Sequence, residues 1–104
     1  MAPKAPKTLQ RFQAAFPKVW KSYEALRDAC DGAGPLDDKT VALIKVVVEV
    51  ARRRHGGLIA HIHRAQQAGA TAQEIHHAAL LAMPLVGFPD ALDAFKTATE
   101  TLDS

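Results

Sequence analysis

The sequence predicts an all-α protein, a compact helical bundle of five or six helices, and three observations support this fold class. Apolar residues recur at steps of three and four along most of the chain, which is the spacing of one helix face. Helix-capping residues stand before two of the apolar runs, at Asp37–Asp38 and at Thr71. Glycine and proline mark short breaks, such as Gly32–Pro35 and Gly87–Pro89.

The length and composition indicate a single soluble domain. The chain has 104 residues, and 13 basic against 11 acidic residues give a net charge of +2, which is too mild to indicate nucleic-acid binding. Its one cysteine excludes an intrachain disulfide and a CxxC motif. No secretory signal and no apolar run of membrane-spanning length is present. We therefore expect a cytoplasmic protein that binds neither nucleic acid nor membrane.

The N-terminal third begins with a Pro/Lys-rich segment, residues 1–7, which we predict to be a disordered tail before a single helical domain over residues 8–104. An apolar and aromatic stripe then recurs at helical spacing and is predicted to be core. Pro17 interrupts the stripe and predicts either a kink or the start of a new helix. The stripe consists of Phe12, Phe16, Trp20, Tyr23, Leu26 and Cys30.

The next helix is predicted over residues 40–54, after a loop at 31–35 and a cap at Asp37 or Asp38. Its run VALIKVVVEV is also compatible with a strand, but its length and the terminal Arg52–Arg54 cluster favour a helix. Apolar residues lie on nearly every side, so we expect a buried central helix that a partner subunit helps to cover.

The remaining elements follow from glycine, proline and capping signals. Gly56 and Gly57 after His55 weaken or break the helix, and residues 58–68 form another that Gly69 ends. Thr71 and Glu74 form a capping box that begins a helix running to about residue 83. After a turn at 87–90, the last helix covers 91–102. Its predicted inward residues are Leu92, Phe95, Ala98 and Thr99.

All five histidines lie between residues 55 and 89. At about 100° per residue, His61 flanks the apolar arc of its helix, whereas His63 faces solvent or another subunit. Residues two apart diverge on a helix, so these two do not chelate one ion. His76 and His77 are interpreted as hydrogen-bonded packing residues.

Metal binding stays open, although the spacing is unspecific. Neither HxxxH nor HExxH occurs, but His55 and His61 could converge with Glu49 on one ion, or symmetry-related histidines could meet on the axis of an oligomer. The sequence requires no cofactor. Cys30 follows a helix C-terminal end beside Asp31, where the helix dipole and the carboxylate disfavour a thiolate, so it is predicted to be core rather than a nucleophile.

Several segments in order carry a family resemblance: LDDKT, ALIKVVVEVA, AHIHRAQQAGATAQEI and VGFPDALDAF. The chain resembles the carboxymuconolactone decarboxylase family, which includes the alkylhydroperoxidase AhpD-like proteins. The resemblance covers about residues 36–95. It implies an all-α fold, association of identical subunits into a homo-trimer or hexamer, and sites near the subunit contacts.

The resemblance transfers little of the family's chemistry. The peroxidase branch carries CxxCxxxH, and counting back from His61 puts Arg54 and Gly57 at the cysteine positions and Ala42 at that of its glutamate. A dithiol peroxidase is therefore not expected, because the thiolate is the nucleophile. The decarboxylase branch resembles ExxxH, and its glutamate position is again Gly57.

Three functions follow from these residues. The first is a lyase-like acid–base enzyme acting on a small carboxylic or lactone substrate, because an imidazole is matched to proton transfer at neutral pH. Its candidate catalytic residues are His61, His55 and Glu49, and its candidate substrate-binding residues are Gly57, His63 and Arg54. The second is a histidine-rich metal-binding protein. The third is a non-catalytic oligomeric protein with a degenerate site.

Overall fold

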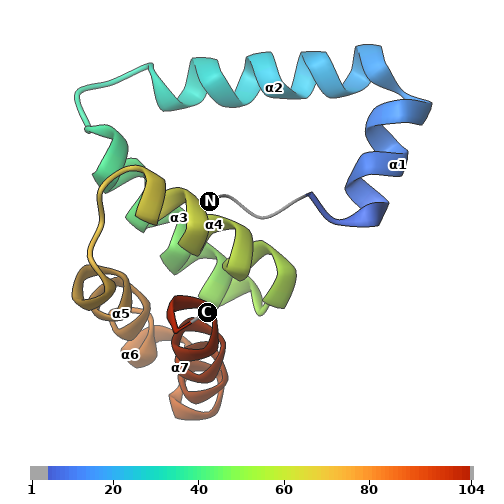
Figure 1. Ribbon diagram of the computed structural model, residues 1–104. Coiled ribbons are helices and arrows are strands. Elements are labelled where there is room, and N and C mark those ends of the chain that lie inside the picture. The colour runs from blue at the N-terminus through green and yellow to red at the C-terminus, as the bar shows by residue number, and fades with distance from the viewer. Residues whose placement is uncertain (1–4, 104) are drawn as a thin grey trace. The chain divides into compact units, whose positions relative to one another are not determined.

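A computed structural model describes residues 5–103, and within this range it contains helices and no strand (Figure 1). The helices are α1 Lys7–Ala15, α2 Pro17–Asp31, α3 Asp38–Arg52, α4 His55–Gln67, α5 Ala72–Leu80, α6 Met83–Val86 and α7 Phe88–Leu102. Because α6 is a single turn of four residues, six longer helices make up the fold, and the predicted all-α class is confirmed. The chain divides into two units, one ending at Pro35 and the other beginning at Leu36.

The first unit consists of α1 and α2. Phe16 separates the two helices, and Pro17 is the first residue of α2. Proline suits this position because its missing N–H would have no partner in the first turn and its φ is already helical. Of the two predicted effects of Pro17, the structure therefore shows the start of a new helix. Of the tail predicted at residues 1–7, residues 1–4 lie outside the described range, and Lys7 already belongs to α1.

The prediction that the aromatic stripe forms a core is wrong. No side chain of α1 or α2 is buried, and Phe16 and Leu26 are 55% and 61% exposed. Two pairs of aromatic rings in this unit, Phe12–Phe16 and Trp20–Tyr23, lie with their centroids 5.5 Å apart, and each pair joins near neighbours in the sequence. Cys30 is exposed as well, not core. Helical spacing places apolar side chains on one face, but it does not supply an element that covers them.

The hydrophobic core belongs to the second unit. There α3 packs against α4 and α5, and α7 packs against α4 and α5 (Figure 1). The largest fully buried side chains are Val46, Ile62 and Ile75, one from each of three helices. Alanines make up most of the rest of the core, which lets the helix backbones approach closely.

Both predicted helix caps of this unit are confirmed. The Asp37 side chain accepts a hydrogen bond from the Thr40 N–H at 2.8 Å and begins α3. Thr71 and Glu74 form a reciprocal capping box at the start of α5, with bonds of 2.9 and 3.1 Å. Gly69 follows α4 with a φ of 94°, the positive value expected of a glycine that ends a helix.

Within the single chain, α3 leaves Ile44 and Val48 46% and 45% exposed, so its expected coverage by a partner subunit stays a prediction. One expectation about α4 needs correction. Gly56 and Gly57 do not form the break between α3 and α4. His55 is the first residue of α4, and both glycines lie in its first turn. The break falls just before them, at Arg53 and Arg54. Glycine is disfavoured inside helices but is readily accommodated near their ends.

The C-terminal helices also differ from their prediction. Helix α5 ends at Leu80, and α7 begins at Phe88, earlier than expected. Ala98 is buried as predicted, but Leu92 and Phe95 are 50% and 56% exposed. The buried face of α7 consists of Ala91, Ala94, Thr97 and Ala98. Small residues face the core here because α7 lies close to its neighbours, so the largest apolar side chains are left outside.

Within residues 5–103 no helix has both the length and the apolar character needed to cross a membrane.

Candidate functional site

The connection between α3 and α4 is only two residues long, and it sets the geometry of the site. Arg53 takes a left-handed conformation with a φ of 56°. Its N–H and that of Arg54 both bond back to the last turn of α3, and Arg54 reaches the Glu49 carbonyl at 3.2 Å. The Leu58 N–H in turn bonds to the Arg54 carbonyl at 2.8 Å. This tight reversal places the last turn of α3 beside the first turn of α4.

Glu49 lies in that last turn and is buried, with 7% of the residue exposed. Its Oε1 lies 3.5 Å from Nη1 of Arg52. Its Oε2 is shielded from solvent and accepts no hydrogen bond from any residue in the described range. Buried polar atoms in proteins are nearly always hydrogen-bonded, and leaving one without a partner costs about 1–3 kcal/mol. A buried carboxylate oxygen of this kind is therefore a candidate ligand-binding atom.

Gly57 provides the space that this carboxylate occupies. A Cβ at position 57 would overlap with Glu49 Oε2 and would lie 2.7 Å from the carboxyl carbon. No such obstacle exists at the neighbouring Gly56, where a Cβ would meet open space. Gly57 has an ordinary helical conformation, so the backbone does not require glycine at this position. Glycine is required because a larger residue would overlap with the Glu49 carboxylate.

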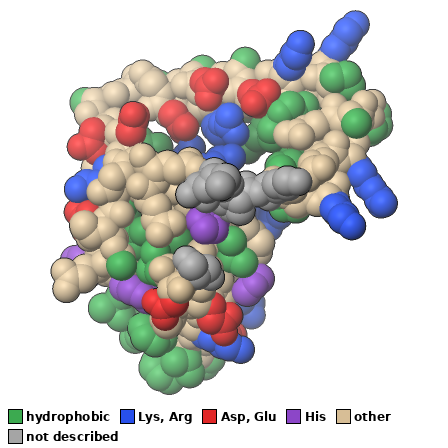
Figure 2. All heavy atoms as spheres, viewed as in Figure 1, with side chains coloured by type: hydrophobic (Ala, Val, Ile, Leu, Met, Phe, Trp, Pro, Cys, Tyr) green, Lys and Arg blue, Asp and Glu red, His purple; other side chains and the backbone are tan. Residues whose placement is uncertain are grey.

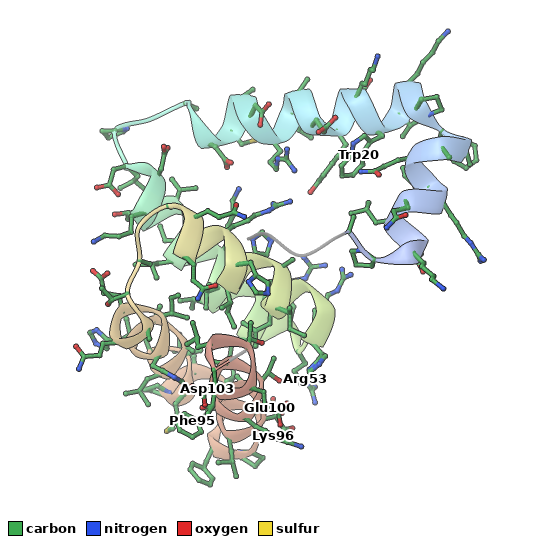
Figure 3. All side chains as sticks on the ribbon, in the orientation of Figure 1. Trp20, Arg53, Phe95, Lys96, Glu100 and Asp103 are labelled. Carbon is green, nitrogen blue, oxygen red and sulfur yellow. The ribbon has the colours of Figure 1, made fainter. Side chains whose placement is uncertain are left out.

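A cavity of about 310 Å³ opens beside Glu49, between the end of α3, the start of α4 and the length of α7. In Figure 3, Arg53, Lys96 and Glu100 lie on one side of α7, and Phe95 lies on the opposite side. The cavity is lined by Glu49, Val50, Arg53, Arg54, His55, Leu58, Asp90, Asp93, Ala94, Lys96, Thr97 and Glu100. The wall thus combines carboxylates, cations and one imidazole.

Most of these charges neutralise one another. Arg53 Nε lies 3.5 Å from Asp90 Oδ2, and Lys96 Nζ lies 4.0 Å from Glu100 Oε1. Arg54, by contrast, forms no ion pair within residues 5–103. Among the cations of the wall, Arg54 therefore remains available to a ligand with an anionic group.

His55 is held by α7. Its Nδ1 lies 3.1 Å from Oγ1 of Thr97, a buried residue. This bond orients the ring and leaves Nε2 for another partner. His55 also borders a second cavity of about 260 Å³, lined by His55, Ile59, His63, Thr97, Glu100 and Thr101.

The structure brings some predicted site residues together and separates others. Glu49, Arg54 and His55 line the larger cavity, and Gly57 adjoins Glu49. His63 lines the smaller cavity, with its Nδ1 3.2 Å from Gln66 Oε1. His61 lines neither cavity; its ring is half-buried, and its Nδ1 is shielded from solvent.

Sequence reasoning missed the contribution of α7. Thr97 fixes His55, and Asp93 and Lys96 complete the cavity wall, but none of them was a candidate. The available signal was the series of small residues at 91, 94, 97 and 98, which marks the inner face of the helix. A threonine within such an alanine face indicates a buried hydroxyl that needs a hydrogen-bond partner.

A metal site gains no support from the described residues. Within residues 5–103, no group of three or more His, Cys, Asp or Glu side chains is arranged to hold an ion. Only His55 of the two candidate ligands borders the cavity, so His55 and His61 as metal ligands stay a prediction.

A separate apolar surface lies on α5, α6 and α7. Figure 2 shows hydrophobic side chains gathered at this end of the unit. Its exposed members are Leu80, Leu81, Leu85, Phe88, Leu92 and Phe95. A small hollow of about 140 Å³ lies among them, where the rings of His76 and Phe95 pack with centroids 5.3 Å apart. No charged side chain lines it.

Comparison with protein families places the chain in a known family. The family model of the carboxymuconolactone decarboxylase family matches residues 17–100, which is most of the chain. The comparison with curated proteins found no match, and the comparison with solved structures found none either. The chain has a single, exposed cysteine, so no CxxC pair is present.

Proposed function

The chain belongs to the carboxymuconolactone decarboxylase family, and we propose that it is an acid–base enzyme acting on a small carboxylic or lactone substrate. The proposed reaction site is the cavity between α3, α4 and α7. One observation carries the proposal: a buried carboxylate, Glu49, presents an oxygen without a partner in the described range beside a cavity that also holds Arg54 and His55. Buried acid–base groups that line a cavity are the usual mark of a reaction site.

In the proposed reaction, Arg54 pairs with the carboxylate of the substrate, because its guanidinium can form two parallel hydrogen bonds to such a group. Glu49 accepts a proton from the substrate. His55, held by Thr97 through Nδ1, supplies or receives a proton through Nε2. Together these residues provide an anion-binding group, a base and a second proton-transfer group around one cavity.

The proposed reaction does not use His61. That residue was a predicted catalytic residue because it matches the family histidine, but it does not line the cavity. A thiol-based reaction is not part of the proposal, since Arg54 and Gly57 stand at the positions that the resemblance gives to cysteines. Self-association into a trimer or hexamer is part of it, and the exposed apolar surface of α5–α7 is consistent with subunit contacts.

The proposal can be tested without knowing the substrate. Small keto acids and lactone acids are incubated with the protein in D2O, and NMR measures deuterium uptake at carbons beside the carbonyl as well as turnover. We expect at least one acid to exchange, and Glu49→Gln to reduce the rate about 100-fold or more, in the range of a lost acid–base group. His77→Gln is the control, since His77 is exposed and lines none of these cavities.

A parallel His61→Gln variant separates the two candidate sites. If it abolishes exchange while Glu49→Gln retains it, the chemistry belongs to His61 and the proposed cavity is wrong. If no acid is exchanged or converted by the wild-type protein, a non-catalytic role is favoured instead.

A further inference from the structure

Among the side chains that line the cavity, Glu49 and Arg54 each carry a polar group without a partner in the described part of the chain, and the two groups differ in charge. One is Oε2 of the buried Glu49, and the other is the Arg54 guanidinium. We infer that the ligand of this cavity is a small acid that also carries a hydrogen-bond donor, either a hydroxyl or an ammonium group. This inference rests on the proposed function, and it narrows the class of substrate.

The need for a donor follows from the surroundings of Glu49. Its Oε1 already has Arg52 nearby. Two other donors on the cavity wall are engaged elsewhere, Arg53 with Asp90 and the Thr97 hydroxyl with His55, and neither Arg54 nor His55 donates a hydrogen bond to Glu49 Oε2. A carboxylate oxygen has only acceptor capacity when ionised, so an acid without an O–H or N–H group would leave Oε2 unsatisfied. A ligand with a donor removes this penalty.

The need for an acidic group follows from Arg54. The other two cations of the wall, Arg53 and Lys96, lie against Asp90 and Glu100. A ligand carboxylate on Arg54 compensates the remaining cation through a two-point contact that a lysine could not give. Glu49 thus requires a hydrogen-bond donor on the ligand, and Arg54 requires a carboxylate on the same molecule.

The two kinds of donor are distinguished by charge. Asp93 also lines the cavity without an ion-pair partner in residues 5–103 and adds negative potential, which favours an ammonium group. A hydroxyl satisfies Glu49 Oε2 without requiring that potential. Both share the chemistry that the inference names, an acid with an adjacent donor.

Three compounds with the same four-carbon skeleton test the inference: butyrate, 3-hydroxybutyrate and 3-aminobutyrate. Each is titrated into the ¹⁵N-labelled full-length protein, and dissociation constants come from amide shifts of residues 49–58 and 90–100. We expect at least one donor-bearing acid to bind about tenfold more tightly than butyrate, as a hydrogen bond to a charged group implies. The stronger of the two identifies the donor as hydroxyl or ammonium.

Variants assign the effect to its residues. In Glu49→Met the advantage of the donor-bearing acid over butyrate is expected to vanish, and in Arg54→Met all three acids are expected to weaken together. Arg64→Met is the matched control, because Arg64 is an exposed arginine of α4 that does not line the cavity. It should leave every affinity within about twofold of wild type.

The outcomes separate this inference from the proposed function. Equal binding of butyrate and both donor-bearing acids, still dependent on Arg54, overturns the inference and leaves the acid-binding site intact. A donor advantage that survives in Glu49→Met also overturns it. Absence of binding by all three acids counts against the site itself.

Discussion

The carboxylate of Glu49 fills the space in which a side chain at position 57 would otherwise lie. The two residues come from consecutive helices, and Gly57 faces Glu49 because only Arg53 and Arg54 separate α3 from α4. The buried position of the carboxylate therefore depends on a missing methyl group on the next helix. This relationship gives a direct way to move Glu49 without changing it.

Gly57→Ala is expected to displace the Glu49 carboxylate while leaving the fold intact. The new Cβ overlaps with the end of a flexible side chain, which can rotate away. Replacing a helical glycine by alanine gains up to about 1 kcal/mol, which offsets the cost of that movement. Urea unfolding should show a change in the free energy of unfolding of less than about 1 kcal/mol, while acid binding in the cavity is lost.

Gly56→Ala is the matched control for this variant, since its Cβ would meet open space. It should retain binding and stabilise the protein by about 0.4–1 kcal/mol, because alanine reduces the conformational entropy of the unfolded chain. Unchanged binding in Gly57→Ala would show that the position of Glu49 does not matter for the ligand.

Glu49→Met is expected to stabilise the folded protein. Methionine has a similar length, removes a buried oxygen that lacks a partner, and leaves Arg52, whose side chain is 55% exposed, free to reach water. Relieving the unsatisfied oxygen should increase the free energy of unfolding by about 1–2 kcal/mol. A decrease in stability, measured by urea unfolding at neutral pH, would mean that Glu49 holds the fold together rather than serving the cavity.

Thr97→Val tests whether the threonine hydroxyl sets the orientation of His55. Valine keeps the shape of the side chain but removes the 3.1 Å contact to Nδ1. We expect a loss of about 1 kcal/mol in the free energy of unfolding and a changed tautomer balance of His55, measured from its ring ¹⁵N shifts. Thr101→Val is the control, because that hydroxyl donates only to the Thr97 carbonyl at 2.7 Å. Identical His55 shifts in wild type and Thr97→Val would refute the assignment.

The capping box of α5 predicts how stability changes in acid. The Thr71 N–H, and then the Lys39 ammonium at 2.9 Å, hold the pKa of Glu74 below its ordinary value of 4.5. The stabilisation is therefore complete above pH 4.5 and is lost as the pH falls through the lowered pKa. Glu74→Gln keeps the capping geometry without the charge and should reduce this acid dependence in urea unfolding. An unchanged acid slope would contradict the prediction.

The same ion pair acts at alkaline pH. The hydrogen bond from Lys39 to Glu74 raises the pKa of Lys39 above 10.5. The contribution of this bond to the free energy of unfolding is therefore complete below pH 10.5 and is lost as the pH rises through the raised pKa. Above pH 10.5 the unfolding temperature of the wild type should fall more steeply with pH than the unfolding temperature of Lys39→Met. Parallel curves for the two proteins would exclude the effect.

Local signals in the sequence predicted most of the secondary structure. The Asp37 and Thr71 caps, the new helix at Pro17 and the left-handed Gly69 each depend on chemistry within a few residues, so the sequence contains the required information. The burial of Leu92 and Phe95 was predicted wrongly because it depends on which face of α7 meets α4 and α5. Close packing of alanines determines which face of α7 is buried, and the periodicity of apolar residues does not predict that face.

The candidate site was predictable only in part for the same reason. Glu49, Arg54 and His55 lie within seven residues of one another, and a short connection brings them to one cavity. The pairing of His55 with Thr97 joins residues 42 positions apart and requires the tertiary fold. The family resemblance indicated His61, but conserving the position of one histidine does not determine which wall of the fold carries a cavity.

The imidazole of His55, together with Thr97 and Glu100, lines both of the hollows that lie along α4 and α7. A shorter side chain at position 55 would remove volume from the boundary that the two hollows share, and it would also remove the bond to Thr97. We therefore expect the size of the side chain at position 55 to influence how far a bound molecule can extend from one hollow toward the other.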